Sequence, residues 1–389
     1  NGTLDHLGSD RRLGGKSDGV DGPCSPASKC HTVVVIDATK REGPSAMNVT
    51  TVGFDLAKNV SQVHGVDAEG RVVLRKRLRR AEVISFFANL SPCLIGMEAC
   101  ATAHHWAREV KDLGHQVKLM PPAYVKPYVR RGKNDVVDAE AICEAVGRPS
   151  MRYVPVKSAE QQSVLMLHRS RDLLIRQRTM LSNALRAHLA EFGIIAAQGL
   201  SHVGKLLAIV ADEEDDRVPA LARAALSTLA GQWRELQVRI KDIEDKIVAW
   251  HRADAASRRL ATIPGVGPIT ASAMAATVSD PSCFRSGREF AAWLGLVPRQ
   301  NSSGGKQRLG GISKQGDHYL RRLLVVGATA VIRYARTKTA ADSRWVNQLL
   351  ERRCPRVASV ALANKTARIA WAILSRGEVY RAAPQAVAA

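Results

Sequence analysis

The sequence lacks the features of several common protein classes. No apolar run approaches the roughly 18 residues that a membrane-spanning helix requires, so we expect no transmembrane segment. The seven cysteines are scattered and form no C-x-x-C pair, which argues against a zinc site of that type and against a disulfide framework. The glycine-rich segments with which an actin-like sugar kinase holds adenosine and phosphate are also missing. We therefore expect a cytoplasmic protein with reduced thiols.

Acidic residues are scarce relative to basic ones. Lys and Arg number 57 against 36 Asp and Glu, which gives a formal net charge of +21 at pH 7. The hydrophobic fraction of 46% excludes bulk disorder. The excess charge is uneven, because residues 1–46 are balanced whereas the chain from residue 261 onward carries 19 basic and 6 acidic residues. A polyanion is the expected partner.

The first two regions differ sharply in pattern. Residues 1–46 lack periodicity, and we interpret them as a non-native or disordered leader before a native start at Met47. Residues 47–157 alternate short apolar runs with turn residues and helical stretches, the pattern of an α/β domain. We expect a three-strand meander followed by alternating helices and strands, an order that suits a ribonuclease-H-like sheet. The expected strands are 49–56, 61–66, 71–78, 93–97 and 116–120, and the expected helices are 81–90, 101–113 and 135–146.

The third region, residues 158–260, contains few turn signals and predicts long helices. Apolar residues recur in it at alternating spacings of three and four, a heptad seam formed by Leu226, Leu229, Trp233, Leu236, Ile240, Ile243, Ile247 and Trp250. This seam favours a coiled coil, either between subunits or as a hairpin with the preceding helix. Residues 261–389 form the fourth region, where the positive charge is concentrated.

Four acidic residues are candidates for a metal site. Asp55 and Glu98 end the first and fourth expected strands, which are neighbours in a ribonuclease-H-like sheet. Asp135 and Asp138 share one face of an expected helix. Each taken alone is as readily a turn or helix-capping residue. Together they predict a site for Mg²⁺ or Mn²⁺, because divalent cations relieve carboxylate repulsion and assist phosphodiester cleavage.

Two segments of the C-terminal region are candidates for nucleic-acid contact. Residues 263–271 resemble the hairpin of a helix-hairpin-helix, in which Gly265 and Gly267 let backbone N–H groups approach a phosphate. Farther along, Ser302 and Ser303 lie in a glycine-rich loop, where a serine near cations is a candidate nucleophile. An ordinary surface loop is the alternative. The basic residues expected to contact nucleic acid are Arg299, Lys306, Arg308, Lys314, Arg321 and Arg322.

From Met47 to about Leu374 the chain resembles the DEDD-type insertion-sequence transposases, a family of bridge-RNA-guided serine recombinases. The motifs that carry this resemblance are Gly-Phe-Asp-Leu-Ala-Lys at 53–58, Gly-Met-Glu-Ala at 96–99, Lys-Asn-Asp-Val-Val-Asp-Ala at 133–139, Ile-Pro-Gly-Val-Gly at 263–267, Gly-Leu-Val-Pro at 295–298, Ser-Gly-Gly-Lys at 303–306, and Lys-Gln-Gly at 314–316 with Leu-Arg-Arg at 320–322.

The resemblance implies a RuvC-like domain, a coiled-coil linker and a mainly α-helical C-terminal transposase domain. It also implies that Asp55, Glu98, Asp135 and Asp138 bind the metal and that Ser303, or failing that Ser302, forms a covalent link to DNA. The implied partners are double-stranded DNA, a noncoding guide RNA and further copies of the chain in a homodimer or homotetramer. A bacterial, nucleoid-associated location would follow.

Two other functions remain open. One is a metal-dependent junction-resolving or nicking nuclease that uses water as its nucleophile, and the other is a noncatalytic coiled-coil nucleic-acid-binding protein. We interpret the pair His104-His105 as a helix-surface feature, since it has no further partner at metal-ligand spacing.

Overall fold

The computed structural model describes residues 48–129, 135–335 and 341–381. The expected leader, residues 1–46, and the expected start at Met47 lie outside these described residues, as do Lys133 and Asn134 of the 133–139 motif. Within the described residues, no helix combines the length and the apolar character that crossing a membrane would demand.

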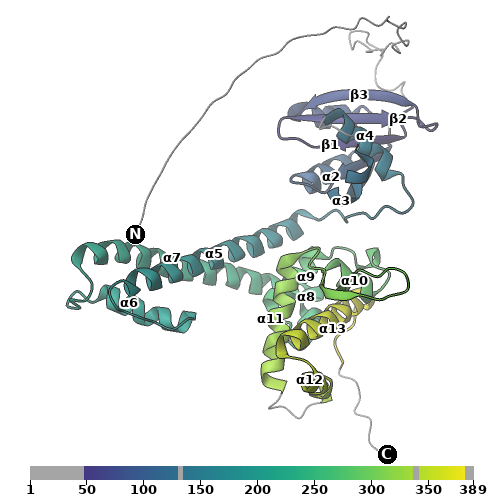
Figure 1. Ribbon diagram of the computed structural model, residues 1–389. Helices are drawn as coiled ribbons and strands as arrows, with labels where there is room; N and C mark the ends of the chain where they lie inside the picture. Colours follow the sequence, from purple (N-terminus) through teal and green to yellow (C-terminus); the bar gives the residue numbers. More distant parts are fainter. Residues whose placement is uncertain (1–47, 130–134, 336–340, 382–389) are drawn as a thin grey trace, which may run out of the picture. The chain divides into compact units, whose positions relative to one another are not determined.

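A five-stranded mixed sheet organises the N-terminal region (Figure 1). The strands stand in the order β3-β2-β1-β4-β5. β1 pairs antiparallel with β2, and β2 with β3, whereas β1, β4 and β5 run parallel. The predicted meander and the predicted proximity of the first and fourth strands are therefore confirmed. The strand bounds are β1 Thr51–Asp55, β2 Val60–Val66, β3 Val72–Arg79, β4 Leu94–Glu98 and β5 Gln116–Met120.

Helices cover this sheet through two separate apolar clusters. One cluster joins the strands to α1 (Val83–Ala88) and α2 (Ala103–Asp112). The other includes side chains of α3 (Pro122–Val125) and α4 (Asp135–Val146) together with Met120 of β5. Predicted bounds for β5 and α4 agree with the structure, whereas α3 is too short to leave a periodic signal. Short 3-10 turns at Arg80–Glu82 and Lys126–Tyr128 complete the region.

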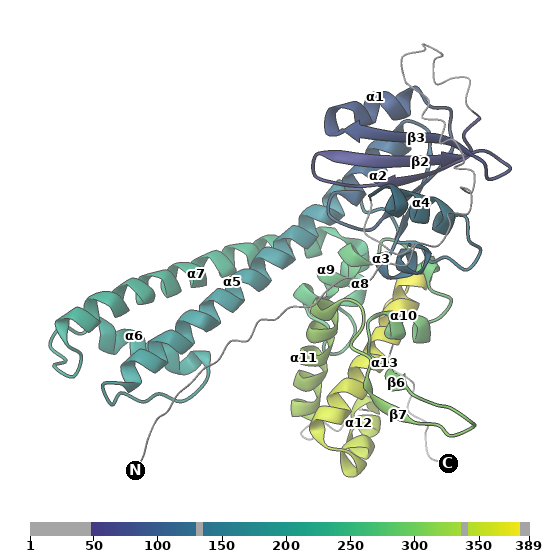
Figure 2. The same cartoon turned by 45° about the horizontal axis from the view of Figure 1, so that its top comes forward.

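The predicted long helices form an antiparallel hairpin of α5 (Ala159–Ala190) and α7 (Ala220–Ala253), seen side by side in Figures 1 and 2. Between them lie a 3-10 turn at Leu200–His202 and α6 (Val203–Ala211). A capping box begins α5, where the Ser158 side chain accepts from the Gln161 N–H and the Gln161 side chain accepts from the Ser158 N–H.

Side-chain pairs set the antiparallel register of the hairpin. The Nε1 of Trp250 donates to Glu160 over 2.8 Å, and the Nε1 of Trp233 donates to the Ser182 hydroxyl over 2.8 Å. All eight seam residues of α7 are buried or half-buried. The two helices form an intramolecular hairpin, whereas coiled-coil packing, within this hairpin or between subunits, stays a prediction.

The C-terminal region is mostly helical, as predicted. Its helices are α8 Ala255–Leu260, α9 Pro268–Thr277, α10 Gly287–Trp293, α11 His318–Ala335, α12 Ala341–Arg352 and α13 Pro355–Arg376, with a 3-10 turn at Pro281–Cys283. Phe290, Leu320 and Ala367 lie in its core. His168 of α5 ties the helical hairpin to this core, with its two ring nitrogens 3.1 Å from the hydroxyls of Tyr319 and Ser272. A small antiparallel hairpin of β6 (Pro298–Gln300) and β7 (Leu309–Ile312) is the one β element of the region within the described residues.

Candidate active site

The parallel pair β1 and β4 places two carboxylates at the same edge of the sheet. Thr51 pairs with Leu94 and Val52 with Ile95, so the same register brings Asp55 opposite Glu98 where both strands end. The three residues that precede each carboxylate are buried, and Asp55 and Glu98 themselves are half-buried. Asp55 and Glu98 therefore lie where the buried part of each strand ends and the sheet edge meets solvent.

Helix α4 adds two further carboxylates. It packs so closely on β1 that a Cβ at Gly53 would lie 2.1 Å from the backbone oxygen of Ala139 and 2.5 Å from the nitrogen of Cys143. Glycine at this position therefore sets the depth of the helix on the sheet. Asp138 directly precedes Ala139 and is half-buried, and the exposed Asp135 is the first residue of the helix.

The four carboxylates are electrostatically coupled. The pKa of Asp55 is raised to about 6, first by burial and then by the negative charges of Asp138, Glu98 and Asp135, while a hydrogen bond from the Leu56 backbone opposes the rise. The pKa of Glu98 is raised too, first by burial and then by Asp138. The acidic residues that the sequence selected therefore lie within electrostatic range of one another and form a local excess of negative charge.

The chemistry of this donor set fits Mg²⁺ or Mn²⁺, which prefer carboxylate oxygen. Within the described residues, however, no group of three His, Cys, Asp or Glu side chains is close enough to hold one ion in common. The carboxylates of Asp55, Glu98, Asp135 and Asp138 would have to converge further to do so. A divalent cation would remove the repulsion that raises the pKa of Asp55.

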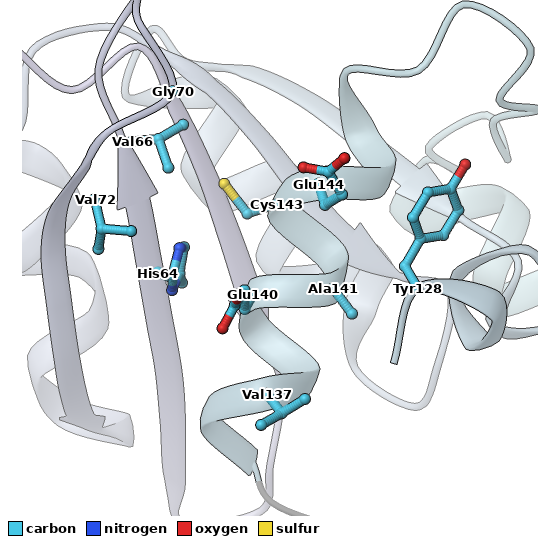
Figure 3. Close-up of a pocket in the computed structure, with 10 residues that line it drawn as sticks. All are labelled: His64, Val66, Gly70, Val72, Tyr128, Val137, Glu140, Ala141, Cys143 and Glu144. Carbon is cyan, nitrogen blue, oxygen red and sulfur yellow. The ribbon is translucent and has the colours of Figure 1, made fainter. Parts of the chain in front are cut away.

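A small pocket lies beside this site, between α4 and strands β2 and β3 (Figure 3). It encloses about 220 Å³. His64 of β2 points toward α4 and toward Glu140 in Figure 3, and it is only 3% exposed. Its Nδ1 has no hydrogen-bond partner among the described residues, and burial lowers its pKa. Sequence reasoning missed this residue, because its pairing with Gly53 across β1 and β2 is set by the strand register in the folded sheet.

Strands β6 and β7 form a hairpin that is visible in Figure 2. The two candidate serines lie in the loop that joins these strands, and they differ in their hydrogen bonds. Gly304 and Gly305 both have positive φ, 54° and 76°, and the Lys306 N–H donates to the Ser303 carbonyl over 3.0 Å. This is the geometry of a type I′ hairpin turn with Ser303 as its first residue. The Ser302 hydroxyl accepts the Arg308 N–H over 3.2 Å, whereas among the described residues no hydrogen bond engages the Ser303 hydroxyl.

The predicted cationic contacts fall into two groups. Arg299, Lys306 and Arg308 are exposed on the β6–β7 hairpin, and exposed Lys314 follows it with a φ of 56°. By contrast, Arg321 donates to the backbone oxygens of Leu294 and Gln315, both over 2.8 Å, and Arg322 is paired with Asp172 of α5. Arg321 therefore stabilises the packing of α11 on the segment around Leu294, and Arg322 joins α11 to α5.

The two glycines of the 263–267 motif also differ. Gly265 has a φ of 82°, and a Cβ there would lie 2.8 Å from the Gly327 oxygen of α11, so its small size serves helix packing. Gly267 is the N-cap of α9, and a Cβ at that position would meet nothing within 4 Å. Of the pair, Gly267 is the one whose backbone lies open.

Comparisons with known proteins bear on both regions. A family model described as Transposase matches residues 52–194, and one described as Transposase IS116/IS110/IS902 family matches residues 257–343. A protein of Pseudomonas aeruginosa named as a family 20 transposase is 55% identical over 336 residues, which are 86% of this chain and 99% of that protein.

Two further relatives cover nearly the same length. A protein of Sinorhizobium fredii named as transposase y4pF/y4sB is 48% identical over 90% of both chains. The transposase for insertion sequence element IS1328 of Yersinia enterocolitica is 43% identical over 86% of this chain and 99% of its own. With both regions matched and identity this high over nearly whole relatives, the chain belongs to the IS110/IS116/IS902 family of insertion-sequence transposases.

Proposed function

We propose that this transposase cuts and rejoins DNA through a covalent link to Ser303, with Mg²⁺ or Mn²⁺ held by Asp55, Glu98, Asp135 and Asp138. The observation that carries the proposal is the gathering of four carboxylates at one sheet edge in a chain of net charge +21. Burial and the neighbouring carboxylates together raise the pKa of Asp55 to about 6, so its ionised form destabilises the metal-free protein, and strongly shifted carboxylates of this kind cluster at functional sites. When bound there, the metal would supply positive charge to the transferring phosphoryl group.

The hairpin geometry supports Ser303 over Ser302 as the nucleophile. The Ser302 oxygen accepts a backbone hydrogen bond that helps to close the loop, whereas Ser303 stands at the start of a tight turn with exposed cations on both sides. In the proposed step the Ser303 oxygen bonds to phosphorus and gives up its proton. The displaced deoxyribose oxygen leaves and takes up a proton. Attack by the hydroxyl of the new DNA end reverses the exchange and frees the serine.

We further propose that target choice is delegated to an element-encoded RNA and that active subunits act together as a dimer or tetramer. The exposed basic residues suit recognition of nucleic-acid backbones, which carries no sequence information by itself. Pairing between an RNA and DNA supplies sequence in such systems without base-reading side chains.

A covalent-adduct assay tests the nucleophile. Purified protein is incubated with Mg²⁺, the flanking element RNA and labelled donor and target DNA, and is then run on a denaturing gel beside S303A, S302A and D55N. A protein–DNA adduct that S302A retains, and that both S303A and D55N lose, is the expected result. An adduct lost in S302A and retained in S303A would move the nucleophile to Ser302. Omission of the RNA is expected to abolish the adduct.

The alternative function is a metal-dependent nuclease with water as nucleophile. The observation in its favour is that the carboxylates belong to β1, β4 and α4 of the N-terminal region, while both serines belong to the β6–β7 hairpin of the C-terminal region. Strand cleavage by S303A without any adduct in the wild type would establish this second function.

A further inference from the structure

A cleft lined by cations begins at the residue that follows Glu98. This cleft, which we call the cationic cleft, encloses about 590 Å³. It lies between the turn after β4, helix α2 and the beginning of α5. Its lining includes Cys100, His104, Arg108, Lys157 and Arg169. Among the residues that the structure describes, no acidic side chain lines it. The cleft is therefore positively charged, whereas the carboxylate site that directly precedes it in the chain is negatively charged.

The backbone at the mouth of the cleft is held in an unusual conformation. Thr102, a β-branched residue, has a φ of 72°, and the Ala103 N–H donates to the Cys100 carbonyl over 3.3 Å. A non-glycine residue in the left-handed region costs free energy and is concentrated at functional sites. The Cys100 N–H donates to the Glu98 carbonyl over 2.8 Å, and Ala99 and Cys100 both line the cleft. The cleft and the carboxylates are thus neighbours in space as well as in sequence.

Hydrogen bonds fix the walls of the cleft. The guanidinium of Arg108 on α2 donates to the Lys157 carbonyl over 2.8 Å, and the Lys157 N–H donates to Nδ1 of His104 over 3.2 Å. His104 is accordingly part of a built site, which corrects its interpretation as a helix-surface residue; His105 keeps that description, with its Nδ1 3.6 Å from Glu109. Because Nδ1 accepts a hydrogen bond, neutral His104 carries its proton on Nε2 as a donor.

The cations of the cleft lack matching anions. Within the part of the chain that the structure describes, none of Arg108, Lys157 and Arg169 forms an ion pair. Burial, then Lys157, Arg108 and Arg169, lower the pKa of His104 to about 4, and burial with Arg169 lowers that of Lys157. Asp317 offsets the effect on Lys157, but its carboxylate accepts two N–H bonds at the start of α11. Such uncompensated cations create a site for an anion.

We propose that the cationic cleft binds a backbone phosphate of the DNA strand whose neighbouring phosphodiester is cut at the carboxylate site. The inference rests on the proposed function of that site. An acidic site repels the DNA backbone on either side of the phosphate that reacts, and cations immediately beyond Glu98 would hold the strand in place there. Arg108, Lys157 and Arg169 are positioning residues in this assignment, since they contact a phosphate that does not react.

Neutral linkages placed one at a time in the DNA test this assignment. A set of oligonucleotides, each with one methylphosphonate at a different position, is measured for binding to the full chain with its RNA, with Ca²⁺ replacing Mg²⁺ to prevent cutting. The wild type is expected to lose affinity most at a linkage beside the cleavage position. In R169Q and K157Q, a methylphosphonate at that one position is expected to have no effect on affinity. The effects of methylphosphonates at all other positions should match those in the wild type. Their affinity should also depend less steeply on salt, with a slope smaller by about 0.7 for each phosphate of a single strand that the variant no longer neutralises.

The matched control is R239Q, which removes the same charge from the exposed face of α7, where Arg239 pairs with Glu235. It is expected to keep the wild-type profile. An unchanged profile in both R169Q and K157Q would overturn the proposal, as would a dependence on linkages of the RNA alone. The proposed function of the carboxylate site is tested independently, because the binding profile is measured without cleavage. That function would be wrong if D55N still cut DNA in Mg²⁺.

Discussion

Gly53 of β1 and Gly96 of β4 are register partners in the parallel strand pair, and α4 lies against both. A Cβ at Gly96 would come within 2.7 Å of Cβ of Val146, at the end of α4, just as one at Gly53 would meet Ala139 near its beginning. Two neighbouring glycines thus form the surface, here called the α4 seat, on which the helix that carries Asp135 and Asp138 packs. The spacing of the carboxylates is therefore set by residues that have no side chain.

We expect G53A to push α4 away from β1. The added methyl group would meet backbone atoms of α4, which cannot move aside singly, so the whole helix must shift; the expected loss is about 3 kcal/mol of unfolding free energy. Urea denaturation measures the loss. G147A is the control, since a Cβ at Gly147 would meet nothing within 4 Å. Equal stability of both variants would contradict this account of the α4 seat.

D55N is expected to stabilise the metal-free protein at neutral pH. The pKa of Asp55 is raised from 3.8 to about 6 in the folded state, so the stability that its proton confers is present below about pH 4 and is lost as the pH rises through 6. The uncharged amide of Asn avoids that loss. We expect a gain of about 1–2 kcal/mol at pH 7.5, less than the full shift because the carboxyl is partly solvated, and none at pH 4.

Urea unfolding in EDTA at both pH values measures this difference. D112N serves as the control, since Asp112 is an exposed carboxylate of the same domain. Added Mg²⁺ is expected to raise the melting temperature of the wild type more than that of D55N. A wild type that is as stable as D55N at pH 7.5 without metal would show that the carboxylates do not repel one another as inferred.

The sheet and its carboxylates were predictable because they depend on local signals. Each strand alternates or runs apolar, and Asp55 and Glu98 follow three buried residues. Strands β6 and β7 were missed because their seven residues are exposed or nearly so and leave no hydrophobic pattern. The cationic cleft was missed for another reason: Arg108 and Lys157 are 49 residues apart and meet only through tertiary packing. The same packing decides that Arg322 pairs with Asp172, which sequence cannot reveal.

The buried seam of α7 predicts a strong contrast between two apolar residues of that helix. Ile247 is fully buried, whereas Val238 is 70% exposed. I247A should leave a cavity and lower the free energy of unfolding by about 2–4 kcal/mol. V238A, at an exposed position, should change it little. Hydrogen exchange of α5 and α7 locates the loss, which should spread along both helices. Protection unchanged by I247A would mean that the two helices are not held by this seam.

The turn that presents Ser303 depends on two left-handed glycines, and G305A is expected to distort it. Gly305 has a φ of 76°, which alanine adopts only at a cost of about 1 kcal/mol, whereas Gly311 of β7 has no positive φ and an unobstructed Cβ position. Because the hairpin is exposed, its distortion should leave the melting temperature almost unchanged. Trypsin should cut G305A severalfold faster after Lys306 and Arg308, and covalent adduct formation should fall with it. G311A, the matched control, should behave as the wild type in both assays. Equal proteolysis of the two variants would show that the turn does not constrain Ser303.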